Sequence, residues 1–152
     1  MPTYNIEVQQ LPGIPVAVIQ KTVRQSELPR VVPECCGLVW NAVKAQQAKG
    51  GRHVAIYLDN AMRVEIGVEL LGPFTETNEV VCSTTPAGLV VSTTHFGPYP
   101  KLREANQAIH EWARTNGKRF AGPSWEIYGH WLPEWNNDPT QIRTDVFYLL
   151  AN

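Results

Sequence analysis

His53-Val-Ala-Ile-Tyr57 and Arg63-Val-Glu-Ile-Gly67 decide the fold of this chain, because similar stretches recur further along it. Their counterparts, Trp125-Glu-Ile-Tyr128 and Arg143-Thr-Asp-Val-Phe147, follow in the same order. Short runs of this kind, rich in β-branched and aromatic residues, are typical of β-strands. The sequence therefore predicts a pair of neighbouring strands twice.

Each predicted strand pair is preceded by one further strand and one helix. The apolar runs Val16–Gln20 and Leu89–Ser92 predict the leading strands, and a helical pattern follows each of them. The chain thus contains two strand-helix-strand-strand repeats, over about residues 1–75 and about residues 84–152. We expect both repeats to form one α+β domain over residues 1–152, with an antiparallel sheet and two main helices.

Both predicted helices carry a single apolar stripe, with which each is expected to cover one sheet face. The first helix begins near Pro33 and ends at Gly50-Gly51, and the second ends at Asn116-Gly117, where a positive φ angle is easily adopted. The apolar positions are Val32, Cys36, Val39, Trp40 and Val43 in the first helix, and Leu102, Ala105, Ile109, Trp112 and Ala113 in the second.

The segments between these elements also carry predictions. Residues 63–68 alternate strictly between apolar and other side chains, which predicts a sheet solvated on one side. The stretch 72–86 reads as the connection between repeats, with a short strand at residues 80–82. Residues 131–140 form an irregular excursion whose Trp131 and Trp135 are expected to fold back over the protein, since exposed tryptophans are unusual in a polar loop.

Charge and hydropathy exclude several classes of function. Thirteen basic and 14 acidic residues give a net charge of −1, which offers no electrostatic footprint for nucleic acid or anionic lipid. No apolar run approaches the roughly 20 residues of a membrane-spanning helix, and the N-terminus has no signal-peptide pattern. We expect a cytoplasmic protein that binds neither DNA nor membrane directly.

Metal, cofactor and triad chemistry find little support. The three cysteines lack C-x-x-C spacing and the four histidines lack metal-ligand spacing, so we expect no metal and no cofactor. Ser92, His95 and Asp145 form a triad only on paper, because no nucleophile-elbow sequence surrounds the serine. Gly50-Gly51 is not followed by the Lys-Ser or Lys-Thr of a phosphate-binding loop.

Glu126 is the most informative candidate for function. It lies in a predicted strand, with Tyr128 and His130 on the same face, and ten of the 14 aromatic residues lie between Phe96 and Tyr148. A carboxylate that loses hydration among rings costs several kcal/mol unless something compensates it. A ligand cation would compensate it, and each aromatic face would add about 0.5–2 kcal/mol. The alternative is a solvated strand position beside an arginine.

Several short motifs stand in an order that carries a resemblance. The second half contains Thr94-His-Phe-Gly-Pro-Tyr99, Gly122-Pro-Ser-Trp-Glu-Ile-Tyr128 and Thr144-Asp-Val146, with Asn116-Gly117 and Asp138-Pro139 among them. In their order and spacing these motifs make the chain similar, over nearly its whole length, to the GyrI-like or AraC-type effector-binding family. Trp112, Leu11-Pro12 before Val16–Ile19, and Pro86-Ala-Gly88 fit the same pattern.

The resemblance implies two repeats related by a pseudo-twofold axis, with a central ligand groove. Relatives are often fused to a helix-turn-helix module and bind small, frequently cationic and lipophilic compounds. In several multidrug-binding members a glutamate that matches Glu126 lies deep in the pocket. Other relatives resemble hydrolases of cyclopropane-bearing toxins, or inhibit DNA gyrase. Residues 1–13 are too few for a DNA-binding domain, so we do not expect a transcription factor.

Three functions stand as hypotheses. The first is a stand-alone protein that binds cationic, aromatic or amphipathic small molecules for sensing or sequestration. The second is a hydrolase, with Glu126 as general base and Tyr128 protonating or hydrogen-bonding the leaving group. The third is a protein-protein modulator such as a gyrase inhibitor. The candidate ligand-binding residues are Glu126, Trp40, Tyr57, Phe96, Tyr99, Tyr128 and Phe147.

Overall fold

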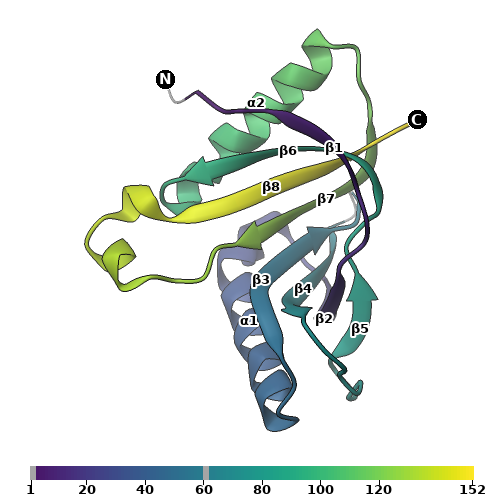
Figure 1. Cartoon of the computed structure of the whole chain (residues 1–152), viewed down its shortest axis with the longest axis vertical. Helices are drawn as coiled ribbons and strands as arrows, with labels where there is room; N and C mark the ends of the chain where they lie inside the picture. Colours follow the sequence, from purple (N-terminus) through teal and green to yellow (C-terminus); the bar gives the residue numbers. More distant parts are fainter. Residues whose placement is uncertain (1–2, 60–61) are drawn as a thin grey trace.

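The computed structural model describes residues 3–59 and 62–152. In that part of the chain, two main helices accompany an eight-stranded sheet (Figure 1), which confirms the predicted α+β fold. The helices are α1 (Leu28–Ala45) and α2 (Leu102–Thr115). The strands are β1 (Glu7–Leu11), β2 (Pro15–Thr22), β3 (Gly50–Tyr57), β4 (Arg63–Leu70), β5 (Val81–Thr84), β6 (Gly88–Phe96), β7 (Phe120–Tyr128) and β8 (Arg143–Leu150).

The strand order shows the duplication directly. It runs β1-β6-β8-β7-β3-β4-β2-β5, and every neighbouring pair is antiparallel. From the middle outward, β3-β4-β2-β5 on one side matches β7-β8-β6-β1 on the other. The two repeats therefore meet at β3 and β7, and the pseudo-twofold axis passes between these strands.

The register between β3 and β7 locates that axis. Ala55 of β3 lies directly opposite Glu126 of β7. The sequence match of Ile56-Tyr57 with Ile127-Tyr128 also makes Ala55 and Glu126 equivalent positions of the two repeats. At its centre, the duplicated sheet thus carries a methyl group on one strand and a carboxylate on the other.

The two outermost strands are exchanged between the repeats. β1 leads the first repeat but pairs with β6, whereas β5 leads the second repeat but pairs with β2. The two crossing connections meet where Ile14 N donates to Thr85 Oγ1 (2.8 Å) and Thr85 N donates to the Ile14 carbonyl (3.0 Å). Each half of the sheet therefore ends on a strand from the other half.

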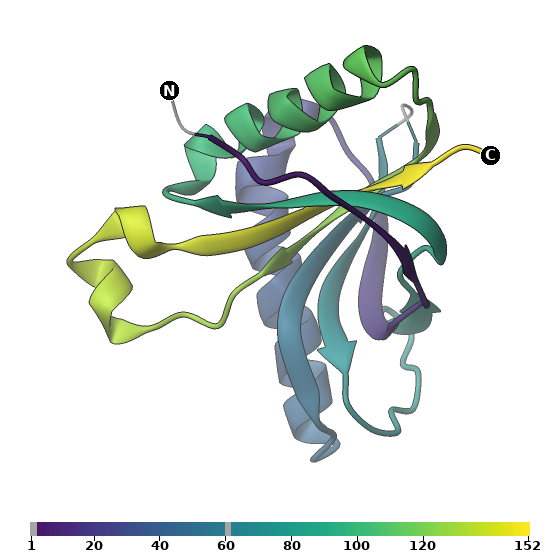
Figure 2. The same ribbon diagram turned by 45° about the horizontal axis from the view of Figure 1, so that its top comes forward.

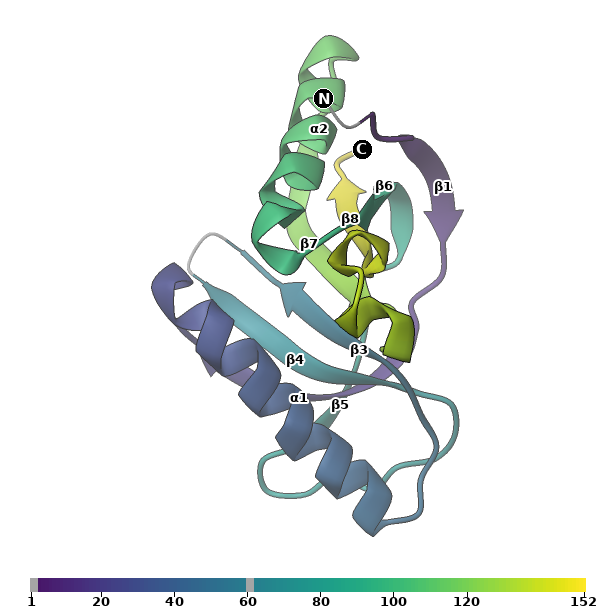
Figure 3. The ribbon, with the colours of Figure 1, turned by 90° about the vertical axis from the view of Figure 1, so that its left-hand side faces the viewer.

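Both helices lie on the same face of the sheet (Figure 3). Glu126 opposes Ala55 on one side and Val146 on the other, so these three side chains share a face. Ala55 belongs to the apolar cluster under α1 and Val146 to the cluster under α2. The sheet between the two helices is therefore the floor of the space that separates them.

The prediction that one sheet face is solvated is wrong for β4, in which Arg63 is exposed and the other residues are buried. The face away from the helices holds a second core cluster around Val54, Trp125 and Ile127, and the crossing connections lie against it. Glu65 is buried on that face because Gln20 Nε2 and Ser83 Oγ each donate to its carboxylate at 2.7 Å.

Two helix boundaries differ from the prediction. α1 begins at Leu28 rather than near Pro33, because Pro29 suits a first helical turn and Pro33 removes only one further N–H. Gly50-Gly51 open β3 instead of ending the helix, and the chain turns at Gln47, whose φ is 55°. Within the described residues, no helix combines the length and apolar character needed to cross a bilayer.

Candidate functional site

A large cavity lies between the two helices, over the strands at the centre of the sheet. Its volume is about 1730 Å³, which exceeds the roughly 300–1,000 Å³ of a typical small-molecule site. Its floor comes from β3 and β7, one wall from α1 and the facing wall from α2, between Leu102 and His110. Asp59 and Met62, from the chain between β3 and β4, line one end, and Gly129, His130 and Trp131 after β7 line the opposite end.

Glu126 stands on this floor, between two tyrosines that are themselves equivalent positions of the repeats. Tyr128 Oη donates to Glu126 Oε1 at 2.7 Å, and Tyr57 Oη donates to the same oxygen at 3.3 Å. Among the described residues, no hydrogen bond reaches Glu126 Oε2. One carboxylate oxygen is therefore engaged by the protein, and the other is available to a molecule in the cavity.

Glu126 is half-buried, and its electrostatics follow from this partial loss of water. Desolvation raises the pKa of Glu126, and the hydrogen bonds from Tyr128 and Tyr57 oppose that rise. Burial and the neighbouring Glu126 charge raise the pKa of Tyr128 and of Tyr57 well above the ordinary tyrosine value. Both hydroxyls therefore remain protonated donors at neutral pH.

The cavity brings together five of the seven predicted residues: Trp40, Tyr57, Tyr99, Glu126 and Tyr128. It does not include Phe96 or Phe147. Phe96 ends β6 with 61% of its surface exposed. Phe147 points to the opposite sheet face and stacks on Trp125, with 5.3 Å between ring centroids. Contrary to the prediction, neither Phe96 nor Phe147 lines this cavity. For Phe147 the reason is the alternation along β8, which directs Tyr148 inward instead.

Three aromatic residues that sequence reasoning did not place in the site also line the cavity: Phe120, Tyr148 and Trp131. Phe120 and Tyr148 form one cluster with His110, with ring centroids 4.8–5.2 Å apart. Tyr148 was accessible to sequence reasoning, because it pairs with Ser124, which shares the face of Glu126. Phe120 and Trp131 depend on the course of connections that have no periodic signal.

The β7–β8 connection is held in place by its tryptophans. It contains two short 3₁₀ turns, η3 (Pro133–Asn136) and η4 (Pro139–Gln141), which extend past the end of the sheet (Figure 2). Trp135 is 5% exposed and lies over Gly129, where a Cβ would come within 3.0 Å of its ring. Trp131 packs edge-on against Trp135 (5.3 Å) and donates from Nε1 to Asn136 Oδ1 (3.1 Å). The prediction that these tryptophans fold back is confirmed for Trp135, while Trp131 stays 51% exposed at the cavity.

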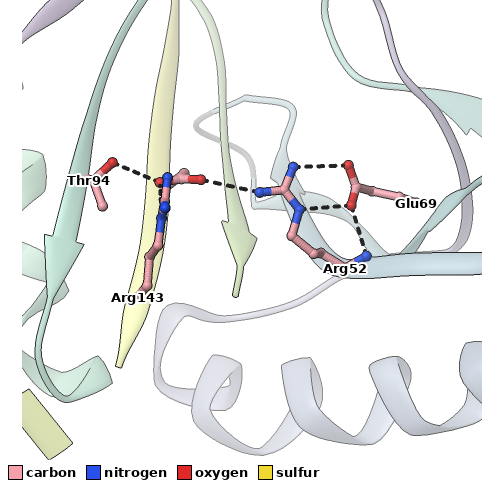
Figure 4. Close-up of polar contacts among 5 residues, drawn as sticks. Arg52, Glu69, Thr94 and Arg143 are labelled. Atoms are coloured by element: carbon pink, nitrogen blue, oxygen red, sulfur yellow. Dashed lines mark hydrogen bonds and ion pairs between the residues drawn. The ribbon is translucent and has the colours of Figure 1, made fainter. Parts of the chain in front are cut away.

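A second polar cluster lies on the opposite face of the sheet (Figure 4). Arg52 Nε contacts Glu69 Oε1 at 3.0 Å, and Arg52 Nη1 contacts Asp145 Oδ2 at 3.4 Å. Thr94 and Arg143 also donate to Asp145. Glu69 belongs to β4 and Asp145 to β8, so this cluster joins the two repeats. It lies on the face away from the cavity and takes no part in it.

Neither cluster resembles a metal centre. In residues 3–59 and 62–152, no group of three or more His, Cys, Asp or Glu side chains is arranged to hold a metal ion. His53, which lines the cavity, has its pKa lowered by burial. The chemistry available to the cavity is therefore that of the Glu126 and Asp59 carboxylates, the Arg103 guanidinium, the Cys36 thiol, phenol hydroxyls and aromatic rings that include three imidazoles.

Fold and site together define a duplicated α+β domain with a central ligand-sized cavity. The chain belongs to the GyrI-like family, since the model of the GyrI-like small molecule binding domain matches residues 4–150. No curated protein sequence matches the chain.

Solved structures share this fold at low sequence identity. The EcmrR C-terminal domain has a TM-score of 0.78 at 22% identity, over 98% of each chain. SAV2435 bound to tetraphenylphosphonium has a TM-score of 0.69 at 11% identity, over 97% of this chain and 94% of that one. A hydrolase from Listeria innocua has a TM-score of 0.64 at 12% identity, over 99% of this chain and 94% of that one. These likenesses establish the fold.

Proposed function

We propose that this domain binds cationic, lipophilic or aromatic small molecules, with Glu126 as their counter-ion, and serves in sensing or sequestration. The observation that carries the proposal is the unshared Oε2 of Glu126 on the floor of the cavity. An ionised carboxylate held away from water loses free energy of hydration, and a bound cation offsets that loss. A neutral ligand would bring no counter-charge to the carboxylate, which would then depend on the two tyrosine hydroxyls alone.

The walls suit the same class of ligand. Trp40 meets the cavity from α1, and Tyr99 meets it from the segment before α2, edge-on to Tyr128 with centroids 5.8 Å apart. Ring faces attract a cation by about 0.5–2 kcal/mol each and also bury apolar ligand surface. The tetraphenylphosphonium bound to SAV2435 is a cation of this kind, carried by a protein of the same fold.

The proposal is tested by removing the charge and keeping the shape. In calorimetric titrations at neutral pH, Glu126→Gln should weaken tetraphenylphosphonium binding by about 1–3 kcal/mol, the value of a charge-assisted contact. Binding of neutral triphenylphosphine oxide should change little. Glu134→Gln, at an exposed position in the β7–β8 connection, is the matched control and should leave both affinities unchanged. Equal losses for both ligands in Glu126→Gln would show that Glu126 only shapes the cavity.

One observation favours hydrolysis as a second candidate function. Tyr128 Oη lies 2.7 Å from Glu126 Oε1, so a carboxylate base and a phenol donor stand side by side on the cavity floor. An enzyme would convert a bound ligand, whereas a binding protein would return it unchanged. Product analysis after incubation with each ligand separates the two, and for an enzyme Glu126→Gln would reduce turnover far more than binding.

A further inference from the structure

The cavity is long, and Glu126 lies well inside its length. β7 contributes to the floor from Phe120 to Tyr128, and the β7–β8 connection continues the lining as far as Trp131. Since a strand rises about 3.3 Å per residue, roughly 13 Å of strand separates Gly122 from Glu126. The carboxylate thus divides the cavity into a first arm toward Trp131 and a second arm toward Phe120.

The first arm has aromatic walls on three sides. Trp40 packs edge-on against His53, which is the cross-strand partner of Tyr128, so it belongs to this arm. Tyr99 stands edge-on to Tyr128, and Trp131 lies at the outer end. Because Trp135 and Asn136 hold Trp131, this end of the arm is a fixed surface.

The second arm has its own set of rings over a small floor residue. Ser124 lies on the floor beside Tyr57, one position along the sheet face from Glu126. Phe120, His110 and Tyr148 form the ring cluster at this end. The chain leading to α1 lies here too, because Val23 N donates to the Met62 carbonyl at 3.1 Å.

We propose, on the basis of the function argued above, that the ligand is an elongated cation whose charge lies between two ring systems, one for each arm. A cation with a single ring would leave one arm filled with water. The cavity volume of about 1730 Å³ accommodates both rings at once. The pseudo-twofold axis explains the form of the site, because it places the carboxylate at the centre and an aromatic end on either side.

Two permanent cations that differ only in the number of ring systems test this. Di(naphthylmethyl)dimethylammonium carries two rings about its nitrogen, and (naphthylmethyl)trimethylammonium carries one. Titrated against the native protein, the two-ring probe should bind about tenfold more tightly or better, since burying a second ring removes much more apolar surface from water.

Blocking each arm in turn identifies where the rings lie. A Cβ on Gly37, which lines the cavity one helical turn before Trp40, would meet no atom within 4 Å. Gly37→Leu should therefore fill part of the first arm, and Ser124→Leu part of the second. Each should weaken the two-ring probe by about tenfold. The one-ring probe should lose little in either variant, because it can use the other arm. Leu71→Ala, at an exposed position after β4, is the control and should leave the affinities of both probes unchanged.

The outcomes separate this inference from the proposed function. Equal affinity of the two probes for native protein, or loss of two-ring binding in only one blocked variant, would overturn the two-arm inference. If Ser124→Leu fails to fold, Phe120→Ala removes a ring from the same arm and should weaken the two-ring probe selectively. Unchanged affinity of both probes in Glu126→Gln would instead overturn the proposed function.

Discussion

At the scale of single residues, the site depends on the different roles of the two carboxylate oxygens of Glu126. Tyr128 and Tyr57 both donate to Oε1 of Glu126, and Oε2 is left for the ligand. The hydroxyls stabilise the ionised form in a desolvated place, and their own pKa values are raised so far that they stay donors. The tyrosines therefore limit the rise in the pKa of Glu126 and leave its Oε2 available.

Tyr128→Phe tests whether the tyrosine hydroxyls stabilise the ionised form of Glu126. Removing the shorter hydrogen bond should raise the pKa of Glu126 further, so that cation binding begins at higher pH than in the native protein. Tyr57→Phe removes the longer bond of 3.3 Å and should move the midpoint less. The measurement is the affinity for tetraphenylphosphonium as a function of pH. A midpoint that stays in place or moves downward in Tyr128→Phe would contradict the role of the hydroxyls.

The pH dependence of folding stability should reflect the titration of Glu126. Between the ordinary glutamate pKa of about 4.3 and the raised pKa of Glu126, the folded chain holds a proton that the unfolded chain has released. The contribution of this group to stability therefore falls as pH rises through that window. Glutamine does not titrate. In thermal melts, the Tm of Glu126→Gln should therefore rise relative to the Tm of the native protein as pH rises through the window, and the difference should not change below the window. A constant difference at all pH values would refute this.

At the scale of elements, β4 shows how closely the sheet is packed. Gly67 lies between β2 and β3, and a Cβ there would overlap the carbonyl oxygen of Ala17. The alternation of side chains along β4 predicts that one face of this strand is solvated, but the crossing connections cover that face. A pattern local to one strand contains no information about a connection that returns from another part of the chain.

Gly67→Ala and Gly37→Ala form a matched pair for this packing. Gly67→Ala should destabilise the fold by about 3 kcal/mol or more, because the overlap is with backbone that cannot move aside. Gly37→Ala, in α1 with no atom within 4 Å of the new Cβ, should stabilise by about 0.5–1 kcal/mol. Denaturant unfolding measures both. A neutral Gly67→Ala would mean that β2 and β4 are less tightly paired than described.

The elements also show why sequence reasoning located part of the site. Helix and strand periodicity placed Trp40, Tyr57 and Tyr128, since each lies on a regular element beside Glu126. The prediction that Phe147 lines the cavity is wrong because a shift of one residue reverses the face of a strand, and Tyr148 takes the inward position. Trp131 lies on an irregular connection, where its position depends on the burial of Trp135.

At the scale of the whole molecule, the exchanged strands link the two repeats. β1 completes the second half of the sheet and β5 completes the first. Arg52, which contacts Glu69 of β4 and Asp145 of β8, adds a further link between the repeats. The floor of the cavity is itself the junction of β3 with β7, so a separated half would have neither its edge strand nor its site.

Fragments 1–75 and 76–152 test this unity. Each should lack a cooperative fold alone, because each exposes a strand edge and an apolar face that the other half covers. Amide spectra of the separate fragments should show poor dispersion, and mixing them should restore dispersion if the exchanged strands re-form. A well-dispersed spectrum from either fragment alone would show that the repeat folds independently.

The most direct test of the central claim is the proton balance of cation binding. If Glu126 is the counter-ion, a permanent cation should expel the proton that the raised pKa retains. Tetraphenylphosphonium titrations in buffers of different ionisation enthalpy, over a pH range that starts at the ordinary glutamate pKa of about 4.3 and extends upward, should show protons released by the native protein near the raised pKa of Glu126. Glu126→Gln should release none. Equal proton release by both proteins, or none from the native protein at any pH in this range, would contradict the account.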